Sequence, residues 1–325
     1  MKLQCISISL TLACLLQGNA LNAQEADVCA PCRTAAVMDL NATLLEIKSG
    51  YSRSAAHGAV TEDEEEREEW LEEMREEYAE AYEEAMAQHE ARLVFCGKSG
   101  ECFYDVDLDP AHFMTPEEII ENPNPYWPMT PGTLYRYRGI TDEGEEEIIE
   151  VRFTGDVRMI EDIPCMVVRD TVWKDGEVAE DTWDWYAQDK EGSVWYFGEI
   201  TFEYEDEQIS GLEGSWETGK DGAKPGYQMP AAPSVGFAYR QELLYTEAED
   251  AAEVLALGQS VQVEYGSFDD CVQTADYNLL DPGMLEHKNY APGIGFILEL
   301  KPETGERVEL IAVETFNVET ESEED

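Results

Sequence analysis

Aromatic rings and carboxylates are concentrated between Asp181 and Tyr204, so this segment could hold a ligand. Flat rings stack on sugar rings or other apolar groups, while carboxylates and amides make the hydrogen bonds that orient a ligand. We therefore expect a binding site for a small apolar molecule or a glycan. Its predicted contacts are Trp183, Asp184, Trp185, Tyr186, Gln188, Trp195, Tyr196 and Glu199.

A tight turn fixes the geometry of this segment. Asp189 and Gly192 stand at the first and fourth turn positions, which suits a β-hairpin with Gln188 opposite Val194. A hairpin covered on both faces by the rest of a core would have the same composition without any ligand. Side-chain alternation predicts one face with Trp183, Trp185, Trp195 and Glu199, and another with Asp184, Tyr186, Gln188 and Tyr196.

A calcium site is another interpretation of the same segment, because Ca²⁺ prefers oxygen ligands. The candidate ligands are Asp181, Asp184, Asp189 and Glu191. Their spacing lacks the ligand order of an EF-hand, so the local density of oxygen atoms is the only support. The sequence requires no cofactor, and Ca²⁺ is the one that it leaves open.

No sequence motif predicts catalysis. GxSxG, HExxH and a phosphate-binding glycine loop do not occur, and the four histidines lack metal-ligand spacing. A glycosidase, however, needs only two carboxylates at the right separation. The pairs Asp184 with Glu217 and Glu242 with Glu286 therefore leave a carbohydrate-active hydrolase or lyase as an alternative function.

The first residues are typical of a secretory signal peptide. Lys2 precedes an apolar stretch over residues 6–16, and small residues follow up to Ala23, after which we expect cleavage, with Ala20 as the alternative. This predicts a secreted protein, either periplasmic or extracellular. No later stretch has the length and apolar character of a transmembrane helix.

Six cysteines follow the predicted signal peptide, and an even number in an oxidising compartment predicts disulfides. We expect a Cys165–Cys271 bridge, because each of these residues stands alone in a strand-like run. The other four allow three pairings. Neither the context of a redox motif nor zinc-ribbon spacing surrounds them, which favours structural cross-links. These four are Cys29, Cys32, Cys96 and Cys102.

Two helices are predicted before the β-rich part. Apolar side chains recur at helical spacing between Leu71 and Leu93 and, over a shorter stretch, between Val37 and Ile47. Residues 24–114 are therefore expected to be an acidic helical segment, in which residues 29–102 form a helical hairpin tied near both ends by its cysteines. A capping box and several prolines then predict a short helix and an extended connector over residues 115–132.

From residue 133 the chain consists of short β-branched and aromatic runs separated by turn residues. We predict a mainly β fold: an antiparallel meander forming a barrel, half-barrel or sandwich, with an N-terminal disulfide-tied helical hairpin. This β-rich domain should cover residues 133–313, before an acidic tail over residues 314–325. Within it, only residues 248–257 have a helix-like composition.

The charge excludes two classes of partner. The chain has 72 Asp and Glu against 21 Lys and Arg, a formal net charge of −51. Nucleic-acid binding and anionic membrane surfaces both need clustered Lys and Arg. Neither is therefore expected, and the charge fits a protein adapted to salt, which screens self-repulsion.

Several blocks in the β-rich part resemble a group of uncharacterised secreted bacterial proteins. These blocks are NPYWPMTPGTLYRYRG, DTWDWYAQDKEGSVWYFGE, GSWETGKDGAKPG, VEYGSFDDCVQT and YAPGIGFILE. The last two are also similar to exported domains of unknown function with folds like periplasmic lipoprotein carriers. The resemblance implies a β-rich fold over about residues 123–313, and the group has no established activity or catalytic residues to carry over.

The resulting expectation is a secreted, non-catalytic binding or carrier protein for a small apolar or carbohydrate ligand. A carbohydrate-active enzyme and a calcium-binding structural protein of the envelope or matrix are the alternatives. The sequence does not specify an oligomeric state.

Overall fold

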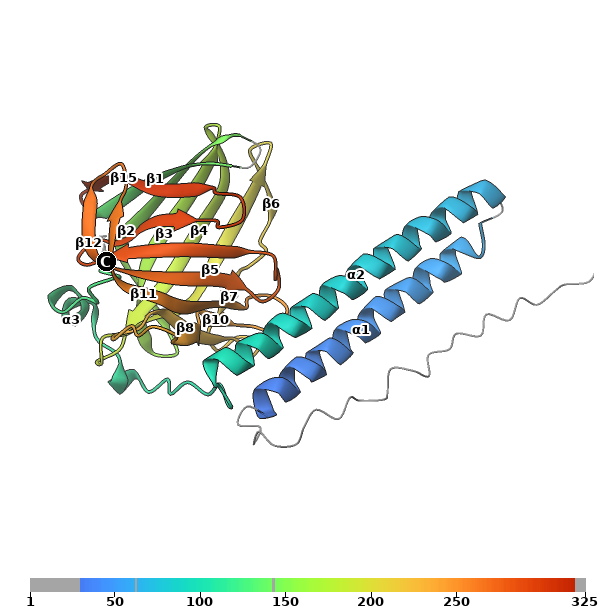
Figure 1. Ribbon diagram of the computed structural model, residues 1–325, viewed down its shortest axis with the longest axis horizontal. Coiled ribbons are helices and arrows are strands. Elements are labelled where there is room, and N and C mark those ends of the chain that lie inside the picture. The colour runs from blue at the N-terminus through green and yellow to red at the C-terminus, as the bar shows by residue number, and fades with distance from the viewer. Residues whose placement is uncertain (1–29, 62, 142–143, 319–325) are drawn as a thin grey trace, which may run out of the picture.

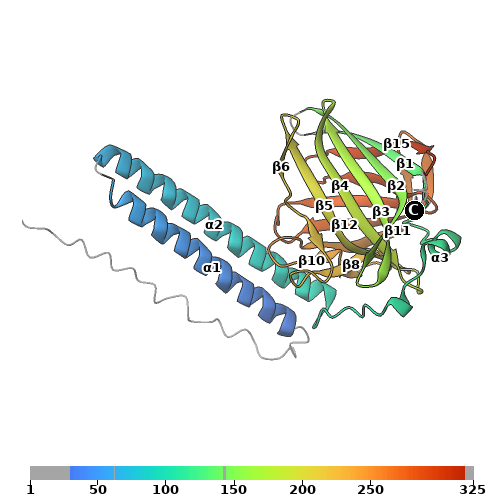
Figure 2. The same cartoon turned by 180° about the vertical axis from the view of Figure 1, so that it is seen from behind.

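The protein has two parts, a long helical hairpin and a β-barrel (Figures 1 and 2). A computed structural model describes residues 30–61, 63–141 and 144–318. The predicted signal peptide, Cys29 and residues 319–325 of the predicted tail lie outside these ranges. The helical elements are α1 (Ala30–Gly58), α2 (Glu64–Ser99), a 3-10 turn (Pro110–His112) and α3 (Pro116–Glu121).

Local sequence signals set the helix ends. The Asp63 side chain accepts hydrogen bonds from the backbone N–H groups of Glu65 and Glu66 at the start of α2. Gly100 ends that helix in the left-handed conformation, with φ of 65°. The predicted capping box of α3 is also present, between Thr115 and Glu118.

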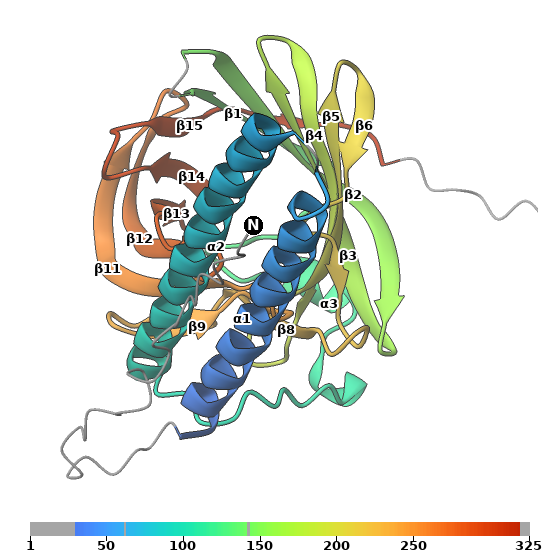
Figure 3. The ribbon, with the colours of Figure 1, turned by 90° about the vertical axis from the view of Figure 1, so that its right-hand side faces the viewer.

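The β-domain is a single antiparallel sheet that is nearly closed as a barrel (Figure 3). Its first and last strands, β1 and β15, pair in the middle of the strand order. The ends of the order are β10 and β9, which only Gln241 separates in the chain, so the chain itself brings the sheet edges together. The described strands are β1 (Thr133–Ile140), β2 (Glu146–Ile160), β3 (Ile163–Lys174), β4 (Glu177–Gln188), β5 (Val194–Glu205), β6 (Gln208–Gly211), β7 (Trp216–Glu217), β8 (Lys224–Met229), β9 (Ala238–Arg240), β10 (Glu242–Leu243), β11 (Asp250–Gln262), β12 (Ser267–Asn278), β13 (Leu285–Ala291), β14 (Gly295–Leu300) and β15 (Arg307–Thr315).

Alternation along the strands produces two hydrophobic layers. In β3, Met166 and Val168 point into the barrel and join the large interior cluster. Cys165 and Val167 point outward, where Phe113 and other apolar residues cover them. Phe113 lies just before the predicted connector, and the connector itself supplies Met129, which is fully buried in the interior cluster.

The helix-like composition of residues 248–257 is misleading, because residues 250–257 lie in strand β11. It pairs with β12 on one side and with β9 on the other. Ala251 is fully buried against Phe95 of α2 and Leu279. Alanine is therefore selected here by the space left under the helix, and tertiary packing overrides its helix propensity.

The end of α2 docks on the barrel, while the rest of the hairpin projects away from it (Figure 1). Arg92 is 3% exposed and donates two hydrogen bonds to Glu249, at 2.8 and 2.6 Å. It also pairs with Asp39 of α1 at 2.6 Å. One buried guanidinium therefore joins both helices to the chain just before β11.

The hairpin is disulfide-tied as predicted, through Cys32 and Cys96, with Cys102 packed against them. The predicted Cys165–Cys271 bridge is wrong, because both residues have free thiols. Cys165 lies under the outer hydrophobic layer of β3, whereas Cys271 belongs to the interior cluster on β12. The two thiols therefore belong to different layers, on strands that are not neighbours.

These two thiols should react only after unfolding. Both residues are fully buried, and burial raises the pKa of the Cys271 thiol to about 11 and that of Cys165 further. At pH 8 we expect iodoacetamide to label both in denaturant and neither in the native protein, as read by peptide mapping without reduction. A cross-linked Cys165–Cys271 peptide would contradict the structure.

Candidate functional site: a polar cavity inside the barrel

The barrel contains a partly open cavity of about 280 Å³. Aromatic and aliphatic side chains from β1, β2, β13 and β14 form part of its wall, together with Trp127 of the connector. The polar lining residues from the strands and their connections are Asp170, Asp184, Gln228, Gln241, Asp250, Asp276, Asn278, Glu286, Lys288 and Glu299.

The predicted hairpin contributes to this cavity through one of its faces. Gln188 pairs with Val194 and Tyr186 with Tyr196, so the predicted register is confirmed near the turn. Asp184, Tyr186 and Tyr196 line the cavity, and the Tyr196 hydroxyl donates to Asp184 at 2.6 Å. The two tyrosine rings stack with centroids 4.8 Å apart. Three predicted contacts therefore lie in one enclosed site.

Gln188 shares this face but has a structural role. Its amide donates to the carbonyl of Asn122 at 2.8 Å and accepts from the N–H of Asn124 at 3.0 Å. The side chain is 1% exposed. It fastens the connector across the end of the hairpin, which leaves it unable to contact a ligand.

The predicted face of Glu199 is wrong because β5 contains a bulge. Trp185 pairs with Gly198, while the next pair is Tyr186 with Tyr196, so one extra residue is inserted in β5. Gly198 has φ of 135°, which favours glycine at this position. The insertion reverses the alternation and places Glu199 directly opposite Asp184, on the same side of the sheet.

The three tryptophans of the hairpin lie on the outer side of the sheet. Trp183 and Trp185 line a shallow outer groove, where the Arg158 guanidinium lies 4.0 Å from the Trp185 ring. Trp195 packs on Tyr227, and its N–H donates to Asp189 at 2.8 Å. The sheet itself therefore separates these rings from Asp184, Tyr186 and Tyr196.

The proposed calcium ligands are not brought together. Asp181 pairs with Arg169 at 2.7 Å, while Asp184 faces the cavity. Asp189 accepts the backbone N–H groups of Glu191 and Ser193 within its turn. Over the part of the chain that the structure describes, no group of three or more His, Cys, Asp or Glu residues could hold a metal ion.

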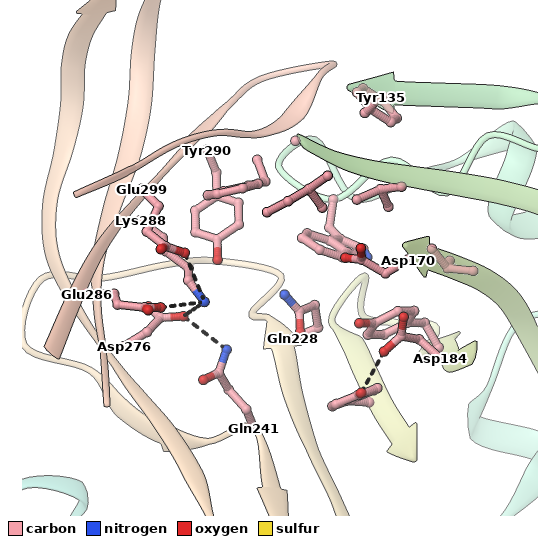
Figure 4. Close-up of a pocket in the computed structure, with 18 of the residues that line it drawn as sticks. Tyr135, Asp170, Asp184, Gln228, Gln241, Asp276, Glu286, Lys288, Tyr290 and Glu299 are labelled. Atoms are coloured by element: carbon pink, nitrogen blue, oxygen red, sulfur yellow. Dashed lines mark hydrogen bonds and ion pairs between the residues drawn. The ribbon is translucent and has the colours of Figure 1, made fainter. Parts of the chain in front are cut away.

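In the opposite wall, the sequence analysis named only Glu286, as a possible catalytic acid, and did not predict the group around Lys288. Lys288 of β13 lies 3.2 Å from Glu286 and 3.8 Å from both Asp276 of β12 and Glu299 of β14. Figure 4 shows this group across the cavity from Asp170 and Asp184, with Gln228 and Gln241 between them. Alternation in β13 could have indicated this group, because Glu286, Lys288 and the buried Tyr290 occupy every second position of the strand and so belong to one side of the sheet.

Burial shifts the acids of this cavity toward their neutral forms. It raises the pKa of Asp184 to about 7, against the opposing hydrogen bond from Tyr196. It likewise raises the pKa of Glu299 to about 7 and that of Asp250 to about 6, although Lys288 opposes both shifts. Burial, reinforced by Asp184, holds the pKa of Asp170 well above its usual value.

Lys288 stays charged for the opposite reason. Burial alone would lower the pKa of its ammonium group, but Glu286, Asp276 and Glu299 together raise it well above the usual value. The exposed part of its side chain, 27%, faces the cavity. This wall is thus an ammonium group surrounded by carboxylates.

Comparisons with known proteins leave the family open. No protein-family model and no curated protein matches the sequence. One solved structure is similar, a protein from Parabacteroides distasonis ATCC 8503 provisionally described as a lipoprotein. The match has a TM-score of 0.31 and 10% sequence identity, and covers 58% of this chain and 98% of that chain. A likeness of this degree carries no argument about function.

Two further observations concern the carboxylate pairs that were considered for a hydrolase or lyase. Glu217 pairs with Arg158 on the outer side of the sheet, so it cannot act together with Asp184. Glu242 accepts a hydrogen bond from the backbone N–H of Asp250, whereas Glu286 pairs with Lys288.

Among the helices in the described ranges, none is long and apolar enough to cross a membrane.

Proposed function

We propose that this chain is an exported, non-catalytic binding or carrier protein that encloses a small ligand within its barrel. The predicted signal peptide and the disulfide of the hairpin support export. The cavity volume of about 280 Å³ lies near the lower end of ligand pockets, which are roughly 300–1,000 Å³. A ligand of about one ring with a short substituent is the matching size.

The observation that carries this proposal is a set of unsatisfied polar groups in the wall. The Gln228 side chain is 9% exposed and makes no hydrogen bond with any described residue. Within the same ranges, Oδ1 of Asp170 and the indole N–H of Trp127 are buried without partners. Because buried polar groups in native proteins are nearly always satisfied, these groups favour a ligand with donors and acceptors of its own.

Filling the cavity should abolish binding. Val151 of β2 lines the cavity, whereas Val157 of the same strand is 44% exposed in the outer groove. In ligand-observed NMR with a panel of neutral monocyclic compounds, we expect some to bind the wild type and Val157→Trp. Val151→Trp should lose this binding at least tenfold, because an indole would occupy about a ring's volume of the cavity.

The paired variants also discriminate between the two sides of the sheet. Circular dichroism and thermal unfolding establish that both variants are folded before binding is compared. Loss of binding in Val157→Trp alone would move the site to the outer tryptophan groove. If no compound distinguishes Val151→Trp from the wild type, the interior holds only water and the proposed function is wrong.

A further inference from the structure

The lining of the cavity also indicates the charge of its ligand. Lys288 is the one Lys or Arg among the described residues that line the cavity. Six lining residues are acidic: Asp170, Asp184, Asp250, Asp276, Glu286 and Glu299. A pocket for acyl chains would be apolar throughout, because unpaired carboxyl groups in contact with hydrocarbon are costly. The ligand is therefore expected to interact with acids directly.

Lys288 is not free to bind an anion. Its ammonium group already lies between three carboxylates, at 3.2 to 3.8 Å. Asp276 is in turn held by the amide of Gln241 at 3.2 Å and by the hydroxyl of Thr274. An anionic ligand near Lys288 would therefore meet more negative than positive charge.

The wall formed by β3 and β4, in contrast, has acidic groups without a neighbouring Lys or Arg in the described lining of the cavity. Asp170 of β3 and Asp184 of β4 both line the cavity from paired strands, and burial together with the Asp184 carboxylate disfavours ionisation of Asp170. No described residue donates to Oδ1 of Asp170, and the unpartnered amide of Gln228 lies between this wall and Lys288 (Figure 4). A ligand that brings donors and positive charge would satisfy these groups together.

The remaining lining suits the apolar part of such a ligand. Tyr135, Tyr186 and Tyr290 contribute rings to the same cavity. Aromatic faces attract organic cations electrostatically and also bury hydrocarbon. The low-dielectric walls of the cavity strengthen the electrostatic part of this attraction.

We propose that the barrel interior binds a small organic cation, a protonated amine with a short apolar or aromatic body, whose ammonium group is held by Asp170 and Asp184. This inference rests on the proposed function and specifies its ligand class. Unlike Asp184, Asp170 has no competing donor on Oδ1 among the described residues, so it makes the larger contribution to affinity, and its carboxyl group releases its proton as the ammonium group binds.

Three compounds of nearly equal size test the charge requirement. Isothermal titration calorimetry at pH 7.5 compares benzylamine, benzyl alcohol and benzoate on the wild-type protein. We expect benzylamine to bind at least about tenfold more tightly than the alcohol, with no measurable binding of benzoate. Asp170→Asn should weaken benzylamine binding about tenfold or more and leave the alcohol within about twofold.

Asp181→Asn is the matched control, because Asp181 lies on the neighbouring strand, pairs with Arg169 and faces away from the cavity. It should leave the affinity for benzylamine unchanged. Equal or tighter binding of benzyl alcohol or benzoate would overturn the cation inference while the cavity function stands. The cation inference would also be overturned if none of the three compounds bound while neutral compounds of the panel still bound the wild type more tightly than Val151→Trp.

Discussion

The folded protein is expected to be several kcal/mol more stable at pH 5 than at pH 8. Asp184, Asp250 and Glu299 have pKa values of about 7, 6 and 7, raised from ordinary values of 3.8, 3.8 and 4.5. At pH values between the ordinary and the raised pKa values, the folded state binds more protons than the unfolded state. Stability is therefore fully present below about pH 4 and is lost as pH rises through 6 to 7.

The size of this effect follows from the shifts. One pKa unit corresponds to about 1.4 kcal/mol, so a single acid shifted by two to three units contributes about 3 to 4 kcal/mol. The contributions do not add fully, because all three groups line one cavity and Asp250 and Glu299 both interact with Lys288. Urea unfolding at pH 5, 6.5 and 8 in about 1 M NaCl measures the change while salt screens the surface acids.

Neutralising one buried acid should reduce this pH dependence. Asp184→Asn removes a group that is costly to ionise, so the variant should gain about 2 to 3 kcal/mol relative to wild type at pH 8 and little at pH 5. Asp181→Asn, on the outer side, should keep the wild-type slope. A free energy of unfolding that rises from pH 5 to pH 8 would contradict the burial of these carboxyl groups.

The parts of the fold set by local chemistry were predictable from the sequence. The capping box at Thr115 and the turn between Asp189 and Gly192 both depend on neighbouring residues, and both are present. The pairing of Gln188 with Val194 follows from that turn. Mainly β, antiparallel architecture with a tied helical hairpin was also correct.

Features that depend on distant strands were not predictable in the same way. The bulge before Gly198 moves Glu199 to the other side of the sheet, and no turn signal precedes it. Lys288 and its carboxylates come from three strands at the far end of the chain. In an acidic sequence these residues resemble ordinary surface charges, so closure of the barrel is what identifies them as interior groups.

Loss of Arg92 should be the most damaging single change to the junction between hairpin and barrel. Glu249 is fully buried and Asp39 is 13% exposed, and Arg92 forms an ion pair with each of them. Arg92→Met would leave an uncompensated buried carboxylate, which costs about 3 to 5 kcal/mol. We expect this loss in urea unfolding, together with faster hydrogen exchange in the last turns of α2.

A double variant separates the buried charge from the packing of the arginine. Arg92→Met with Glu249→Gln removes the uncompensated charge, so it should recover most of the stability. Lys98→Met is the matched control, because its ion pair with Glu253 is 46% and 23% exposed and should contribute about 1 kcal/mol or less. If Arg92→Met costs no more than Lys98→Met, the hairpin is held by the Cys32–Cys96 bridge and the packing of Phe95 instead. Its orientation on the barrel would then depend on shape rather than on charge.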